Sequence, residues 1–80
     1  MSRTEIEGKL TDVMRNFFDL PELAVTASTT ASEVEGWDSI AHVGLIVAVE
    51  RAFAVRFTTK EVKSLRTVGD LFVLLEKRVG

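Results

Sequence analysis

Apolar residues recur along the chain at steps of three and four, the spacing of one face of an α-helix. The first run consists of Ile6, Leu10, Val13, Phe17 and Leu20. It predicts a helix over about residues 4–18 whose apolar face packs on a core. Thr4 and Glu7 are spaced to form a capping box at its start, and Pro21 marks its end because proline disfavours helix in the residue before it.

Residues 19–37 show no sustained period and predict a long loop. They include a Ser/Thr cluster over 26–30 and a glycine at Gly36. Loops of this length are uncommon in compact domains and often pack on themselves. We therefore expect Leu23, Val25 and Val34 to tuck into the bundle. The alternative is a connection that only tethers two helices.

The next periodic segment predicts a helix from about Ser39 to Phe53, with Asp38 or Ser39 as its N-cap. At ~100° per residue its large apolar side chains sweep roughly 220°, against the ≳100° stripe of an ordinary surface helix. The side assigned to the core carries Leu45, Ile46, Val49 and Phe53. The other side, beside Ser39, carries Ile40, Val43 and Val47. We interpret this second group as a partner-binding surface, while Gly44 and nearby alanines would permit close helix approach.

The last third of the chain predicts a connector and two further helices. Residues 54–57 alternate, but a lone strand has no partner, so we expect a connector whose apolar residues plug the bundle. Cap-like pairs three residues apart, Thr58 with Glu61 and Thr67 with Asp70, predict a short helix near 59–65 and a last helix near 68–78. The apolar face of the last helix would carry Val68, Leu71, Phe72, Leu75 and Val79. The expected fold is all-α, a small four-helix bundle of three main helices and one short helix, in a single domain over residues 1–80.

The composition narrows the possible functions. Eighty residues, 46% hydrophobic and 28% charged, suit one small domain that buries about 60–65% of its unfolded surface, too little for a deep catalytic cleft. With no cysteine and one histidine, the chain cannot build a disulfide scaffold, a thiol nucleophile or an all-histidine metal site. No uncharged run approaches the ~20 residues of a membrane span, and the N-terminus lacks an apolar signal region. We expect a cytoplasmic monomer that is not an enzyme.

Charge is unevenly distributed along the chain. The formal net charge is −2, but residues 1–50 carry three basic and nine acidic side chains, a net of −6. Residues 51–66 carry five basic side chains and only Glu61 as an acid, a net of +4. The molecule should therefore be electrically polarised.

The segment Gly36-Trp37-Asp38-Ser39-Ile40 is the candidate for chemistry, because it delivers a serine hydroxyl to the start of a helix. A helix N-terminus offers unpaired N–H groups and a partial positive charge, so an anionic phosphodiester on Ser39 would be stabilised there. The alternative is that Asp38 or Ser39 is only an N-cap.

The residues around Ser39 resemble those of the acyl carrier proteins. The similarity comprises Asp38-Ser39-Ile40 opening a helix with Val43, Ile46 and Val49, then Glu50-Arg51-Ala52-Phe53 and Val55-Arg56-Phe57. It continues through Thr67-Val68-Gly69-Asp70-Leu71, which is similar to the start of the family's last helix, and covers nearly the whole chain.

The resemblance implies a carrier in which Ser39 receives 4′-phosphopantetheine from coenzyme A. A separate phosphopantetheinyl transferase would do this chemistry and contact Asp38. The thiol of the arm would hold an acyl group as a thioester for acyl-loading and acyl-using enzymes, which would read the surface of Ile40, Val43 and Val47.

The chain also departs from the acyl carrier family. Gly44, Arg51 and Ala52 stand where acidic residues are common, so docking to a basic enzyme patch should be weaker. We therefore expect a specialised carrier for a polyketide, modified-lipid or aminoacyl pathway instead of bulk fatty acid synthesis. Peptidyl carriers usually show a Gly-Gly-His-Ser-type motif that Trp37-Asp38 does not match, but an aminoacyl or peptidyl cargo stays an alternative.

Two other classes of protein are alternatives to a carrier. An enzyme with Ser39 as nucleophile and His42 as base has one-turn spacing in its favour, but no second histidine and no Gly-x-Ser-x-Gly turn. His42 is then expected at the surface or its boundary. A helical nucleic-acid-binding module would use the basic residues Arg51, Arg56, Lys60, Lys63 and Arg66. Since that local charge is its only support, we expect no nucleic-acid partner.

Overall fold

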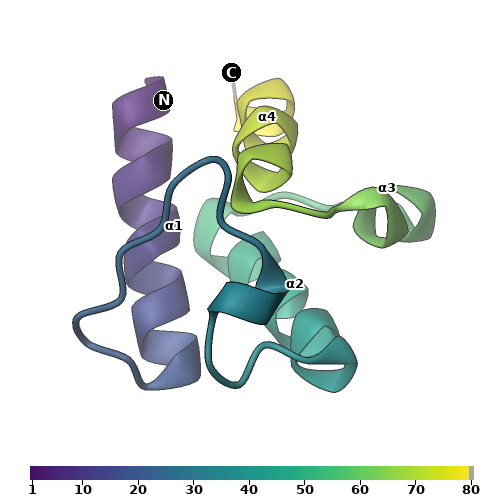
Figure 1. Cartoon of the computed structure of the whole chain (residues 1–80). Helices are drawn as coiled ribbons and strands as arrows, with labels where there is room; N and C mark the ends of the chain where they lie inside the picture. Colours follow the sequence, from purple (N-terminus) through teal and green to yellow (C-terminus); the bar gives the residue numbers. More distant parts are fainter. Residues whose placement is uncertain (80) are drawn as a thin grey trace.

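The computed structural model describes residues 1–79 and contains four α-helices and one 3-10 turn (Figure 1). The elements in chain order are α1 (Arg3–Phe18), η1 (Ala31–Glu33), α2 (Ser39–Phe53), α3 (Thr59–Ser64) and α4 (Val68–Val79). Over these residues the β-type pairing is limited to an isolated bridge between Thr30 and Thr67. The predicted all-α architecture is confirmed, with element bounds that differ by about one residue.

Helix α1 begins differently from the prediction. Ser2 is its N-cap: the Ser2 hydroxyl accepts the amide of Glu5 at 3.2 Å, and the Glu5 carboxylate accepts the amide of Ser2 at 3.0 Å. The predicted Thr4–Glu7 capping box is therefore wrong. Thr4 already lies inside the helix, and Glu7 instead accepts a hydrogen bond from Arg3 one turn away at 2.9 Å.

The buried face of α1 also differs from the predicted one. Its fully buried line runs at steps of four through Ile6, Leu10 and Met14. The prediction omitted Met14 and placed Phe17 in the core, whereas Phe17 is 37% exposed. Three- and four-residue steps are both compatible with a helix face, so the spacing alone could not choose between these two side chains.

Helices α2 and α4 supply the rest of the core as predicted. The predicted side chains of α2, Leu45, Ile46, Val49 and Phe53, are all buried. Those of α4 are buried from Val68 to Leu75, and Val79 is partly buried. Figure 1 shows α1 beside α2 and α4, and the three helices enclose one hydrophobic core.

The loop between α1 and α2 packs on the bundle. Val34 is 4% exposed, and Leu23 and Val25 are half-buried against the core, which confirms the first of the two interpretations. The loop is also hydrogen-bonded to the start of α4: the Val68 amide donates to the Thr29 carbonyl at 2.8 Å. The segment before α2 therefore has a fixed path. The η1 turn within it was not predicted.

Helix α3 is the least buried of the helices. It contains no fully buried residue, and Figure 1 shows it at the opposite side of the molecule from α1. The predicted capping box of Thr58 and Glu61 is present. In the connector before α3, Val55 and Phe57 pack on the core as expected.

Candidate functional site at the start of helix α2

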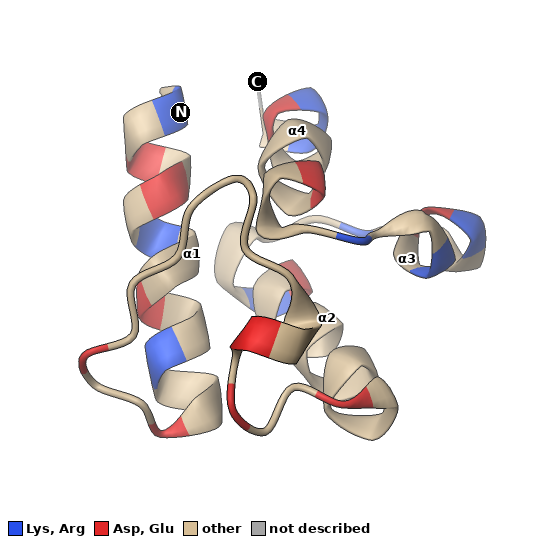
Figure 2. Ribbon diagram, in the orientation of Figure 1, with Lys and Arg blue, Asp and Glu red and all other residues tan. Residues whose placement is uncertain are grey.

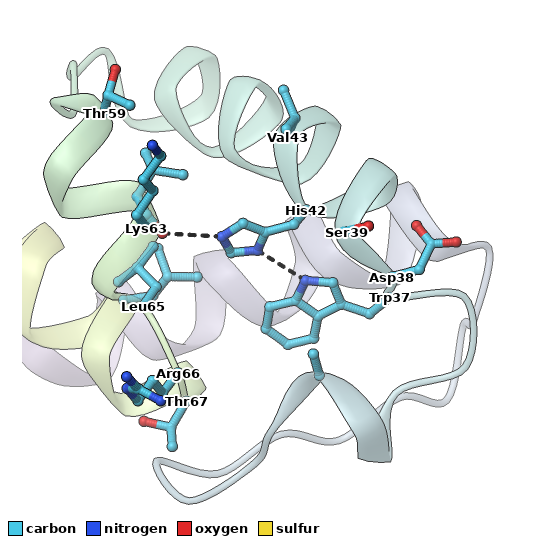
Figure 3. A pocket seen from close by; sticks show the side chains of 13 residues that line it. Trp37, Asp38, Ser39, His42, Val43, Thr59, Lys63, Leu65, Arg66 and Thr67 are labelled. Atoms are coloured by element: carbon cyan, nitrogen blue, oxygen red, sulfur yellow. Dashed lines mark hydrogen bonds between the residues drawn. The ribbon is translucent and has the colours of Figure 1, made fainter.

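Ser39 is the first residue of α2, and its side chain is exposed. Asp38 is the N-cap: its carboxylate accepts the amide of Ala41 at 2.7 Å, and its carbonyl accepts the amide of His42 at 2.9 Å. Figure 3 shows both Asp38 and Ser39 at the open end of the helix. Asp38 thus satisfies the cap, and within residues 1–79 the Ser39 hydroxyl makes no hydrogen bond.

The backbone at this point is suited to an anion. The amides of Ser39 and Ile40 lie in the first turn of α2, where no preceding helical carbonyl can accept them, and they make no hydrogen bond in the described chain. The macrodipole of the 15-residue helix adds a partial positive charge at the same end. A phosphate joined to the Ser39 hydroxyl would meet both.

The turn before Ser39 is held by an aromatic anchor. Gly36 has a φ of 88°, a left-handed conformation that favours glycine. The following Trp37 is 8% exposed, and its ring lies 6.0 Å from that of Phe18 in α1. The path of residues 36–38, and with it the position of Ser39, is therefore fixed by packing.

A pocket of about 470 Å³ lies directly beside Ser39 (Figure 3). Its apolar lining comes from α2, α3 and α4 and the segments before them, and includes Trp37, Val43, Val62, Leu65 and Leu71. Lys63 and Arg66 add two cations on the α3 side. Sequence reasoning missed this pocket because its lining spans residues 31–71, which only the tertiary fold brings together.

The second apolar face of α2 is exposed, as predicted. Ile40 is 84% exposed, Val43 62% and Val47 40%. They follow one another at steps of three and four, so they form a row that starts beside Ser39. We call Ile40, Val43 and Val47 the apolar row.

Basic residues gather on the α3 side of the pocket. Figure 2 shows the blue of Lys and Arg concentrated on α3 and on the connection to α4. None of the ion pairs between described residues involves Arg51, Arg56, Lys60, Lys63 or Arg66.

Nearby carboxylates, in contrast, have internal partners. Glu50 accepts the amide of Phe57 at 2.8 Å, and Glu61 pairs with Arg78. Asp70 accepts the amides of Arg66 and Thr67 at 2.9 and 3.1 Å, and these two hydrogen bonds lower the pKa of its carboxyl. The unpaired side chains of the α3 side are therefore mainly cationic.

His42 is half-buried at the boundary of the pocket. Its Nδ1 accepts a hydrogen bond from the Trp37 indole N–H at 3.1 Å, and its Nε2 lies 3.3 Å from the Val62 carbonyl oxygen. Both ring nitrogens are thus engaged, and neither is bonded to Ser39 within the described chain. This arrangement does not provide Ser39 with a base.

Among residues 1–79, no three or more His, Cys, Asp or Glu side chains gather into a group that could hold a metal ion. Over the same residues, no helix has both the length and the apolar character needed to cross a membrane.

Comparison with known proteins identifies the class to which this fold and site belong. Residues 8–72 match the family described as the phosphopantetheine attachment site. An acyl carrier protein of Kineococcus radiotolerans is 30% identical over 79 residues, which cover 99% of this chain and 98% of that protein. One of Thermotoga maritima is 29% identical over 79 residues, with the same coverage.

A solved structure agrees in fold. The solution NMR structure of a holo acyl carrier protein from Geobacter metallireducens matches with a TM-score of 0.84 and 35% sequence identity, covering 90% of this chain and 83% of that one. The chain belongs to the acyl carrier protein family. It is a carrier of acyl groups, and its cofactor is 4′-phosphopantetheine.

Proposed function

We propose that Ser39 is the residue to which phosphopantetheine is attached. The observation that carries this proposal is that Asp38 caps α2, so the exposed Ser39 hydroxyl is not used as the cap and makes no hydrogen bond in the described chain. The residues present fit the group, because a phosphodiester there would meet two free amides and the helix dipole. Lys63 and Arg66 across the pocket add favourable charge.

When bound, the cofactor supplies a flexible arm with a terminal thiol that holds an acyl group as a thioester. This chain provides the attachment hydroxyl, the charge near the phosphate and the surfaces that partner enzymes recognise. Catalysis is assigned to those partners, because both ring nitrogens of His42 are engaged elsewhere and Ser39 has no base in the described chain. We infer that the protein itself is not an enzyme.

We propose that the apolar row is the surface read by partner enzymes. Ile40 and Val43 are among the most exposed large apolar side chains of the described residues, and water-exposed apolar side chains gathered on one face favour a protein contact. Asp38 lies next to Ser39 and is exposed, so we assign it to recognition by the phosphopantetheinyl transferase.

The charge pattern supports a specialised pathway, such as polyketide, modified-lipid or aminoacyl synthesis. Arg51 follows the apolar row on α2, and Lys60, Lys63 and Arg66 lie on the α3 side, all without ion-pair partners in the described chain. Enzymes that select acidic carriers would bind this face weakly. A cytoplasmic location and a monomeric state stay predictions.

The test is incubation of the apo protein with coenzyme A, magnesium and a broad-specificity phosphopantetheinyl transferase, followed by intact mass measurement. We expect one phosphopantetheine on the wild type and none on Ser39→Ala. Ser64→Ala, which removes another exposed hydroxyl, is the matched control and should be modified normally. An unmodified wild type, with the transferase active on a control carrier, would refute the assignment.

A further inference from the structure

A chain of two hydrogen bonds crosses the pocket beside Ser39 and joins the segment before α2 to α3 (Figure 3). The Trp37 indole N–H donates to Nδ1 of His42 at 3.1 Å. On the other side of the imidazole, Nε2 lies 3.3 Å from the carbonyl oxygen of Val62. The indole and imidazole planes are inclined by only 17°, which suits a bond between an in-plane N–H and an in-plane lone pair. We call this chain the Trp37–His42–Val62 link.

The groups at the two ends of the link determine the protonation state of His42 between them. An indole nitrogen can only donate, and a carbonyl oxygen can only accept. His42 must therefore accept at Nδ1 and donate at Nε2, which is possible only for the neutral imidazole. Protonation would place an N–H at Nδ1 against the indole N–H, and the bond to Trp37 would be lost.

Helix α3 has few other attachments. It contains six residues, none of them fully buried, and its apolar contact with the core comes from the partly buried Val62 and the following Leu65. At its far side, Arg78 of α4 pairs with Glu61 and also donates to the Arg56 carbonyl at 3.3 Å. On the side of Ser39, the Trp37–His42–Val62 link is the hydrogen-bonded connection between α3 and α2 in the described chain. Its loss would free the wall of the pocket nearest the serine.

The charged groups that share the pocket with His42 have both signs. Asp38 lies one turn before it on its own helix, and Lys63 and Arg66 face it from the α3 side. The contributions of η1 and α4, Ala31 and Leu71, have no titratable group. Only the neutral imidazole can make both bonds, so lowering the pH is the condition that tests the link.

We propose that Trp37 and His42 are positioning residues: neutral His42 holds α3 against the start of α2 and keeps the pocket beside Ser39 in shape, and protonation of His42 releases α3. The role of the pocket in sheltering the arm rests on the proposed attachment at Ser39. The link itself does not, because it is made entirely by residues of the chain.

The first experiment follows the apo protein by NMR from pH 8 to pH 5. At pH 8, imidazole ¹⁵N shifts should show His42 with its proton on Nε2. The amides of Val62 and Leu65 report on α3, since each donates a bond within or at the end of that helix. Loss of one hydrogen bond predicts that their exchange protection factors fall about fivefold towards pH 5, while those of the α1 amides hold.

Variants separate the link from general destabilisation. Trp37→Phe removes the indole N–H and keeps an aromatic ring, and His42→Leu removes both bonds. Each should show the low α3 protection already at pH 8 and no further fall at pH 5. Lys60→Gln, an exposed change on α3 outside the pocket, should behave as wild type. If His42→Leu does not fold, the wild-type protein measured from pH 8 to pH 5 and Trp37→Phe still test the link.

A second readout links the pocket to the arm. The wild type, Trp37→Phe and Lys60→Gln are loaded with octanoyl-coenzyme A by the transferase, and thioester cleavage by hydroxylamine is timed at pH 7.5. Cleavage should be about fivefold faster in Trp37→Phe alone.

Failure to load any variant would count against Ser39 attachment and leave the apo NMR result standing. An unchanged α3 protection between pH 8 and pH 5, or an Nδ1–H tautomer, would overturn the link.

Discussion

Gly69 in α4 lies directly against the backbone of Ala27 in the loop before α2. The Gly69 amide donates to the Ala27 carbonyl at 2.9 Å, and a Cβ atom at position 69 would stand 2.6 Å from that carbonyl oxygen. The loop that leads to Ser39 is therefore fastened to α4 at a point where only glycine fits.

Replacement of Gly69 by alanine should destabilise the protein. The new methyl group meets backbone atoms that cannot swing aside, so the loop must move and its hydrogen bonds to α4 weaken. We expect a loss of about 1–3 kcal/mol in the free energy of unfolding, measured by urea denaturation. Gly8→Ala is the matched control, because nothing lies within 4 Å of its Cβ position. That variant should gain up to ~1 kcal/mol, and equal effects at both positions would contradict this account.

Charged substitutions in the apolar row should slow modification by the transferase without lowering the stability of the fold. Ile40→Asp and Val43→Asp place a charge on side chains that are 84% and 62% exposed, so folding should be little affected. Modification by a transferase that contacts this face should slow about tenfold, as expected for a contact worth ~1.4 kcal/mol. Val73→Asp in α4, at a side chain 48% exposed, is the control. Slowing that is equal for all three variants would argue against a localised surface.

The sequence was sufficient to predict features that depend on local spacing. The cap pairs at Thr58 and Thr67 and the two faces of α2 follow from positions three or four residues apart. Met14 and Phe17 could not be told apart, because both fall on the apolar side of α1 and tertiary packing decides which is buried. Gly44 was predicted to permit close helix approach, but the sequence did not show that the Phe17 ring lies over it. A Cβ atom added at position 44 would stand 2.9 Å from that ring.

The sequence predicted the residues of the site, but not the pocket and the hydrogen bonds around them. Asp38 and Ser39 were identified because their chemistry is local to a helix start. The Trp37–His42–Val62 link joins residues up to 25 positions apart, and the pocket lining spans residues 31–71, so no local pattern connects them. Only the packing of α3 across α2 brings them together.

Acid should weaken the start of α4 through Asp70. Hydrogen bonds from the amides of Arg66 and Thr67 lower the pKa of its carboxyl, so the ionised form is favoured by folding. This stabilisation is present above the ordinary carboxyl pKa of ~3.9 and is lost as pH falls through the lowered value. Asp70→Ala should therefore cost about 1 kcal/mol at pH 7 and less at pH 3, by urea denaturation. Glu22→Ala, whose carboxylate makes no hydrogen bond in the described chain, should cost little at either pH; a constant Asp70 effect would contradict the linkage.

Charge at position 51 should control how well the protein docks on basic enzyme surfaces. Arg51 is exposed, lies one turn beyond Val47 on α2 and has no ion-pair partner among the described residues. Arg51→Glu replaces a repelling charge with an attracting one, and should speed modification by a transferase with a basic docking patch several-fold at low salt. The gain should shrink towards 1 M salt, where the screening length falls to ~3 Å. Lys77→Glu makes the same charge change on α4, away from the apolar row. If both variants gain equally, net charge and not a local surface governs docking.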